Sequence, residues 1–190
     1  IADKLRTQVT SINQGVANGN SAITLLQIAD KSMAEQSKIL DTVKSKLIQA
    51  NTATTSSDGR ESIRKDITKL LEQLDNIAQQ TNYNGTYLLQ ESATVSAASN
   101  VHSFQVGEKS TDTIKMTGVK ANTGAGGLAL TTLTGLGTNG LTSALASSEQ
   151  ATVDTAITTL NGYRGDIGST QNQVESAVRN LMTQSTNIKA

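Results

Sequence analysis

Apolar residues recur at every seventh position along three long stretches of this 190-residue chain. In the first stretch these positions hold Leu26, Met33, Leu40 and Leu47. A sustained heptad of this kind predicts a coiled-coil-like helix. The expected helix covers residues 1–51, and about 50 residues at a rise of roughly 1.5 Å each give a rod of about 75 Å. A helix of that length favours an elongated bundle over an ordinary globular domain.

A second helix is expected over residues 59–84, where apolar residues repeat a spacing of four and three. Asp58, followed by Glu61 three residues later, resembles a capping box with Asp in the cap position. Asn84 and Gly85 supply the left-handed residue that ends many helices. The short polar connector after the first helix favours an antiparallel hairpin of the two.

A third long helix is expected over residues 148–190. Six of its apolar residues stand seven apart, namely Val153, Leu160, Ile167, Val174, Leu181 and Ile188. A single stripe of this kind suits a helix that lies along a partner's groove. Gly162, Gly165 and Gly168 are unusual there, because each costs about 1 kcal/mol relative to Ala within a helix. Either the helix is weakened at these glycines or a neighbour approaches its backbone closely.

The middle of the chain lacks the helical period. Phe104 and Val106 alternate with polar residues, as do Ile114 and Met116, which predicts a β-hairpin over residues 103–117. Seven of the 15 glycines fall between Gly118 and Gly140, so residues 118–145 are expected to form loops and turns.

The three apolar stripes predict that the helices pack on one another and not on separate partners. Four leucines are then expected in the interior: Leu26, Leu70, Leu74 and Leu181. The expected fold is a single, mainly α domain over residues 1–190. It is an elongated bundle of three long coiled-coil-like helices with a small β-hairpin.

Charge and composition argue against several classes of function. The 16 basic residues balance the 16 acidic ones, which argues against nucleic-acid binding and electrostatic membrane binding. The chain has no Cys and a single histidine, His102, so thiolate chemistry and a multi-histidine metal site are excluded. The glycine repeat from Gly162 to Gly168 lacks the preceding strand of a phosphate-binding turn. We expect no enzymatic activity, no cofactor and no metal site.

Several segments, taken in order along the chain, resemble bacterial flagellin. The first helix carries Ile1-Ala2-Asp3-Lys4-Leu5-Arg6 and Gln27-Ile28-Ala29-Asp30-Lys31-Ser32-Met33. The second carries Glu72-Gln73-Leu74-Asp75-Asn76-Ile77-Ala78 and Thr81-Asn82-Tyr83-Asn84-Gly85. Phe104-Gln105-Val106-Gly107 is similar to the hairpin of the family, and Arg164 to Gly168 with Gln171-Asn172-Gln173 is similar to its carboxy-terminal helix.

The resemblance implies the rod-like D1 core segment of a short flagellin without the terminal D0 helices. Flagellin is secreted and self-assembles into the extracellular filament that serves motility. Its partners are other flagellin subunits, an export chaperone, the filament cap protein and, in animals, a Toll-like receptor. Two alternatives share the helical pattern: the hook–filament junction proteins and a helical adaptor module of a secretion system.

The resemblance also implies candidate contacts with the receptor or with the filament. Receptor-activating flagellins carry Leu-Gln-Arg-x-Arg-Glu-Leu on the first helix, and its first Arg and last Leu are central contacts. Aligned without gaps, Thr42 replaces that Arg and Lys46 replaces that Leu, while Asp66 retains the acidic contact of the second helix. Thr42 lacks the planar donor fork of Arg, and Lys46 brings a hydrated ammonium to an apolar contact. We therefore expect poor recognition by the receptor.

Overall fold

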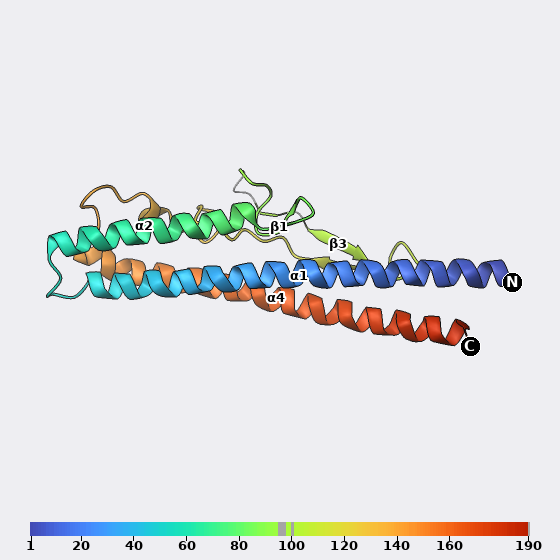
Figure 1. The fold of residues 1–190 in the computed structure, drawn as a ribbon. Helices are drawn as coiled ribbons and strands as arrows, with labels where there is room; N and C mark the ends of the chain where they lie inside the picture. The colour runs from blue at the N-terminus through green and yellow to red at the C-terminus, as the bar shows by residue number, and fades with distance from the viewer. Residues whose placement is uncertain (95–97, 100, 190) are drawn as a thin grey trace.

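The computed structural model describes residues 1–94, 98–99 and 101–189, and it shows a rod built on two long antiparallel helices (Figure 1). Helix α1 (Ala2–Ala50) runs along the whole rod, and α4 (Ser143–Lys189) returns beside it, so that both termini lie at the same end. Ala190, the last residue of the expected third helix, lies outside the described residues.

A third helix covers only part of this pair. Helix α2 (Ser57–Gln80) packs on α1, and its last residue lies beside Ile28 and Ser32 of α1. We call residues 26–50 of α1, all of α2 and residues 143–164 of α4 the three-layer half. The thin half consists of residues 2–25 of α1, residues 165–189 of α4 and the hairpin described below (Figure 1).

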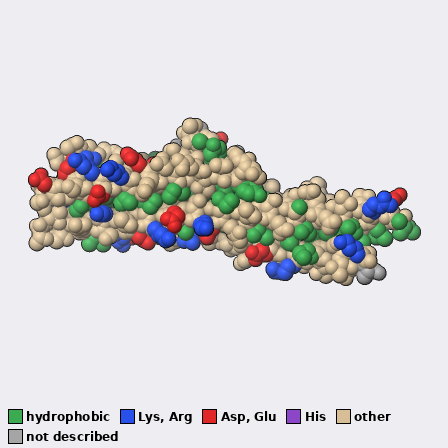
Figure 2. All heavy atoms as spheres, viewed as in Figure 1, with side chains coloured by type: hydrophobic (Ala, Val, Ile, Leu, Met, Phe, Trp, Pro, Cys, Tyr) green, Lys and Arg blue, Asp and Glu red, His purple; other side chains and the backbone are tan. Residues whose placement is uncertain are grey.

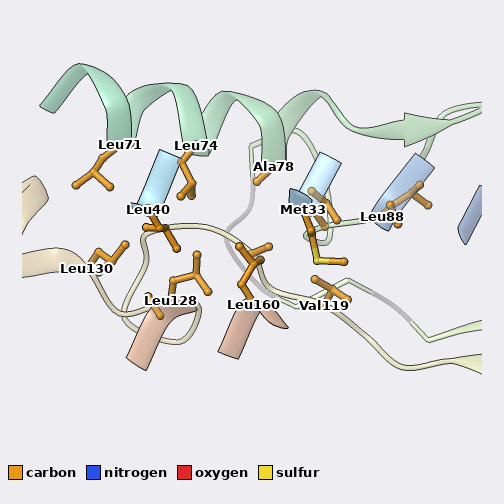
Figure 3. Packing of buried hydrophobic residues seen from close by; sticks show 14 of the residues in the cluster. Met33, Leu40, Leu71, Leu74, Ala78, Leu88, Val119, Leu128, Leu130 and Leu160 are labelled. Atoms are coloured by element: carbon orange, nitrogen blue, oxygen red, sulfur yellow. The ribbon is translucent and has the colours of Figure 1, made fainter. Parts of the chain in front are cut away.

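The heptad positions of α1 form the core of the three-layer half. Leu26, Met33, Leu40 and Leu47 are each fully buried, and Figure 3 shows Met33 and Leu40 among residues of α2, α4 and the intervening loop. Leu74 is also fully buried, and Leu181 of the thin half is 4 % exposed.

The buried stripe of α2 differs from the expected one at Leu70, which is only half-buried at the edge of the core. The neighbouring Leu71 is buried instead. Helix α2 packs on the segment around α3 (Thr131–Thr134) as well as on α1, and Leu71 is the residue that points into this shared core, where Figure 3 shows it near Leu40 and Leu130. Its five buried residues are Ile63, Ile67, Leu71, Leu74 and Ala78.

Both ends of α2 also differ from the sequence-based expectation. The N-cap is Ser56, whose Oγ accepts the Gly59 N–H at 3.0 Å, so Asp58 lies inside the first turn. The helix ends at Gln80, because Thr81 adopts an extended conformation. Asn84 and Gly85 (φ 52° and 83°) instead form the two-residue turn between strands β1 (Asn82–Tyr83) and β2 (Thr86–Tyr87).

A second hairpin crosses the thin half. Strands β3 (His102–Gln105) and β4 (Thr113–Met116) pair antiparallel, with His102 opposite Met116. The hairpin contacts both α1 and α4. Gly19 of α1 allows α4 to approach closely beside the hairpin, because a Cβ atom there would overlap Cγ2 of Val178, whereas Val106, the residue that follows β3, would lie at an ordinary contact distance of 3.6 Å.

The glycine-rich loop is held by polar contacts to both α1 and α2. Gln36 is fully buried, and its Nε2 donates to the carbonyls of Leu74 and Ala121 at 3.1 and 2.7 Å. Asp75 accepts hydrogen bonds from the backbone and hydroxyl of Thr123 at 2.8 and 2.7 Å. These bonds tie the loop to the three-layer half.

Helix α4 begins at Ser143, earlier than the expected residue 148, and continues unbroken through Gly162, Gly165 and Gly168. A Cβ atom at any of these glycines would have no neighbour within 4 Å. No other part of the described chain therefore packs against these glycines.

Candidate contact surfaces

The three candidate receptor contacts lie on one side of the three-layer half. Thr42 is exposed on α1, and its hydroxyl donates to the carbonyl of Lys38 at 3.1 Å. One helical turn further, Lys46 Nζ lies 3.1 Å from Asp66 Oδ2 on α2. The structure therefore brings Lys46 and Asp66 together, and the retained acidic side chain is paired within the chain.

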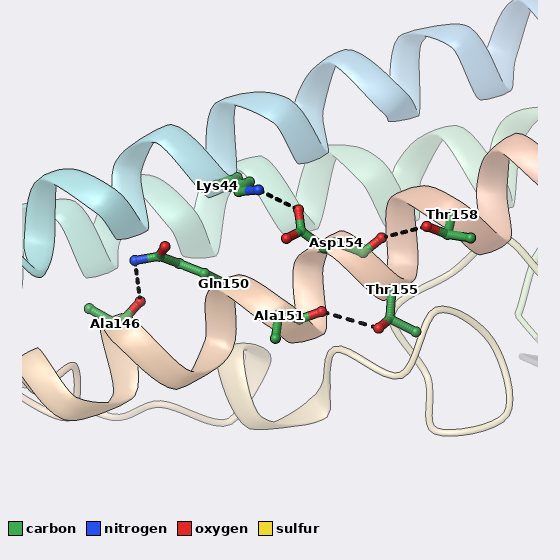
Figure 4. Close-up of polar contacts among 7 residues, drawn as sticks. All are labelled: Lys44, Ala146, Gln150, Ala151, Asp154, Thr155 and Thr158. Atoms are coloured by element: carbon green, nitrogen blue, oxygen red, sulfur yellow. Dashed lines mark hydrogen bonds and ion pairs between the residues drawn. The ribbon is translucent and has the colours of Figure 1, made fainter.

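A similar lysine pairs with α4. Lys44 Nζ lies 2.6 Å from Asp154 Oδ1 (Figure 4), and Arg164 Nε donates to Asp30 at 2.9 Å further along the same two helices. Exposed ion pairs contribute about 0–1 kcal/mol each. Their main effect is on register, because each pair fits only one alignment of α1 and α4.

A cluster of polar groups, partly shielded from solvent, joins α2 to the loop before α4. Arg64 donates to Glu61, and the Asn139 N–H donates to the same carboxylate at 3.0 Å. The hydrogen bond from Arg64, followed by that from Asn139, lowers the pKa of Glu61 to about 2. No local sequence signal predicts this cluster, because Asn139 stands 78 residues from Glu61 in the chain.

Charge is distributed unevenly along the rod. Charged side chains of both signs lie close together over the three-layer half (Figure 2). Residues 7–29 of α1, by contrast, contain no Asp, Glu, Lys or Arg. In the thin half, Leu5 and Met182 are 42 % and 56 % exposed. The α1 segment of the thin half therefore presents mostly uncharged polar groups, whereas the hairpin and α4 carry charged residues there, such as Lys109, Glu175 and Arg179.

His102 has no feature of a catalytic base. Its side chain is half-buried, and its Nε2 is buried without a hydrogen-bond partner in the described part of the chain. Burial lowers the pKa of His102, although a backbone contact with Tyr87 opposes the shift. A general base requires an orienting partner and access to its substrate. Because Nε2 is buried, it offers no access to a substrate.

Among the described residues, no group of three or more His, Cys, Asp or Glu side chains is placed to hold a metal ion. None of the described helices is sufficiently long and apolar to span a membrane.

Two family descriptions match the chain. Residues 1–94 match the bacterial flagellin N-terminal helical region, and residues 150–190 match the bacterial flagellin C-terminal helical region. The first match covers α1 and α2, and the second covers most of α4.

Individual relatives agree with these matches. Flagellin A of Helicobacter felis is 45% identical over 115 residues, 60% of this chain and 21% of that protein. The flagellar filament 30.7 kDa core protein of Treponema maltophilum is 26% identical over 199 residues, 100% of this chain and 67% of that protein. The chain thus spans about a fifth of the length of its Helicobacter relatives.

Solved structures show the same rod. Bacillus cereus flagellin superposes with a TM-score of 0.71 and 29% identity, covering 91% of this chain and 93% of that one. A putative flagellar hook-associated protein from Vibrio parahaemolyticus superposes with a TM-score of 0.79 over 98% of this chain and 92% of that one. At 13% identity, the second likeness concerns the fold alone.

Proposed function

Because this chain belongs to the bacterial flagellin family, a family of structural proteins and not of enzymes, we propose that it is a self-assembling subunit of the flagellar filament. The observation that carries the proposal is the match of both flagellin helical regions to α1, α2 and α4, the helices that build the rod. Identical rods that pack side by side through unlike surfaces form an open helical polymer.

The charge distribution supports packing between identical copies. A surface that repeatedly meets copies of the same chain is penalised when like charges are brought together. The charge-free residues 7–29 and the exposed Leu5 and Met182 avoid that penalty. A junction protein or a secretion-system adaptor needs a surface for a different partner, and the flagellin matches favour the filament subunit over both.

A chimera tests the filament proposal. In a Helicobacter pylori strain without its flagellins, residues 1–94 and 150–190 of this chain replace the matching segments of flagellin A, which is 44% identical over 115 residues. The matched control carries the Helicobacter felis segments. We expect electron microscopy to show filaments from both chimeras. A chimera that is exported and helical but forms no filament, while the control does, contradicts the proposal.

Family membership supports two further partners and a location. We propose that the chain is secreted to the extracellular flagellum, bound by the export chaperone before export and placed by the cap protein at the filament tip. Affinity capture by each purified partner tests this, and loss of capture with a correctly folded full-length chimera contradicts it.

We also propose that the Toll-like flagellin receptor recognises this chain poorly. Thr42 lacks the guanidinium that anchors binding hot spots. Lys46 holds Asp66 at 3.1 Å, so the receptor would have to displace an internal partner to reach that carboxylate. Lys46 is therefore expected to weaken receptor binding in two ways. It removes an apolar contact, and it pairs with the Asp66 carboxylate that the receptor would otherwise bind.

Binding of the purified receptor ectodomain tests this proposal. The triple variant Thr42→Arg, Ser45→Glu, Lys46→Leu is expected to bind at least about tenfold more tightly than the unmodified chain, equivalent to about 1.4 kcal/mol. Lys44→Leu is the matched control, because Lys44 and Lys46 are similarly exposed (35% and 33%) but Lys44 pairs with α4. Nanomolar binding by the unmodified chain, or an equal gain in the control, contradicts the proposal.

A further inference from the structure

Four Asn-Gly pairs occur in the chain, at residues 18–19, 84–85, 139–140 and 161–162. Asn-Gly is a chemically labile pair, because glycine has no side chain to shield its nitrogen from the preceding carboxamide. The ring closure also requires a backbone that is free to bring the two groups together. The four pairs share one local sequence, so differences among them in the folded chain come from the structure.

Three of the pairs are restrained. Asn18 is held at both ends of its amide, since Nδ2 donates to the Gln105 carbonyl at 2.9 Å and Oδ1 accepts from Gln14 at 2.8 Å. Asn161 lies within α4, where the helical backbone holds the following N–H in a hydrogen bond. Asn139 donates its backbone N–H to Glu61 at 3.0 Å, and the Gly140 N–H donates to Gly137 at 2.8 Å.

The fourth pair is the least restrained of the four. Asn84 and Gly85 form the exposed turn between β1 and β2, and the Asn84 side chain has no hydrogen-bond partner in the described residues. No heavy atom lies within 4 Å of a Cβ placed on Gly85. The Gly85 N–H makes one long hydrogen bond, 3.2 Å to Asn82 Oδ1. The strands that flank the turn have two residues each, so little structure opposes its distortion.

We propose that Asn84 is a site of spontaneous deamidation, the first of the four pairs to react in the folded protein. The Gly85 backbone nitrogen attacks Asn84 Cγ and forms a C–N bond, while the Cγ–Nδ2 bond breaks and the side-chain nitrogen leaves as ammonia with the proton from Gly85. Water then opens the cyclic imide at either carbonyl to give an aspartyl or an isoaspartyl residue. Nothing is oxidised or reduced.

Either product alters the turn in a way that can be measured. Both add a carboxylate to a chain whose formal net charge is zero. The isoaspartyl product also lengthens the main chain by one carbon within a two-residue turn, which breaks the pairing of Tyr83 with Thr86.

Incubation of the folded chain at mildly alkaline pH, followed by peptide mapping with mass spectrometry, tests the proposal. The same chain in denaturant is the internal reference, and there the four pairs are expected to convert at rates within a few-fold of one another. In the folded chain, the deamidation rate of Asn84 is expected to stay within about tenfold of its rate in the denatured chain. The rate of Asn18 is expected to fall at least about a hundredfold, since Asn18 reacts only after unfolding.

Asn84→Gln is the matched variant, because its longer side chain closes a ring far more slowly. It is expected to abolish the early acidic species in ion-exchange chromatography without altering conversion at the other three pairs. Faster conversion at Asn18, Asn139 or Asn161 than at Asn84 in the folded chain overturns the proposal. An unchanged acidic species in Asn84→Gln overturns it as well.

Discussion

The two halves of the rod share a heptad pattern but differ in how it is covered. In the three-layer half, α2 and the glycine-rich loop close over α1 and α4, and heptad residues such as Leu26 and Leu40 are fully buried. In the thin half, Ile12 of the same row is also fully buried, and Leu5, near the end of the rod, is 42 % exposed. An apolar stripe thus specifies a helix and the side that faces its neighbours, while the burial of each position depends on the elements that cover it at that point of the rod.

Truncation of a leucine in each half gives the largest expected difference. Leu74→Ala removes a fully buried side chain from the three-layer half and is expected to lower the free energy of unfolding by about 2–5 kcal/mol. Leu5→Ala, in the thin half, is expected to lower it by less than about 1 kcal/mol. Equilibrium denaturation in urea measures both. Equal losses contradict the distinction between the halves.

A glycine gives the next largest effect. Gly19→Ala places a methyl group against Val178, where α1, α4 and the hairpin meet. Overpacking of this kind costs about 1–3 kcal/mol, which exceeds the gain of roughly 1 kcal/mol in helix propensity. We expect a net loss of stability by thermal denaturation. A rise in the melting temperature contradicts the close packing of the thin half at this point.

The glycines of α4 are expected to respond in the opposite direction. Gly162→Ala, Gly165→Ala and Gly168→Ala meet open space, so each is expected to raise stability by roughly 0.5–1 kcal/mol. Circular dichroism at 222 nm, a wavelength that reports roughly on helix content, follows the melting of each variant. If all three variants lose stability, these glycines have a packing role, which contradicts the open space around them in this structure.

The smallest expected effect is a pH dependence of stability, which comes from Glu61 in the three-layer half. The folded-state pKa of Glu61 is lowered to about 2 from its model-peptide value of 4.5, so its contribution is present above that higher value and lost as the pH falls toward 2. Glu61→Gln is therefore expected to melt below the unmodified protein at pH 6 and to approach it near pH 2. A difference independent of pH contradicts the role of the Glu61–Arg64–Asn139 cluster.

Much of this fold follows from periodicity. The heptads predict α1 and α4 nearly to their ends, because an apolar repeat sustained over six or seven heptads has few other solutions. Local signals were less reliable: Ser56 and not Asp58 caps α2, and Asn84 with Gly85 turns a hairpin instead of ending a helix. Caps and left-handed residues occur in several local structures, and tertiary packing selects among them.

The buried polar contacts depend on distant parts of the chain. Gln36 stands in the heptad row of Ala29, Val43 and Ala50, and its polarity there is the signal that marks an unusual core position. Its partners, the carbonyls of Leu74 and Ala121, depend on the path of the loop. Of the candidate receptor contacts, the sequence provided the identities of Lys46 and Asp66, whereas their pairing required the arrangement of α1 beside α2.

Native-state hydrogen exchange along α1 tests most directly the claim that stability resides in the three-layer half. A single continuous helix passes through both halves, so local helix propensity alone cannot produce a step between them. We predict that amides of residues 26–47 exchange at least about tenfold more slowly than those of residues 5–11. Uniform protection along α1 would contradict the account.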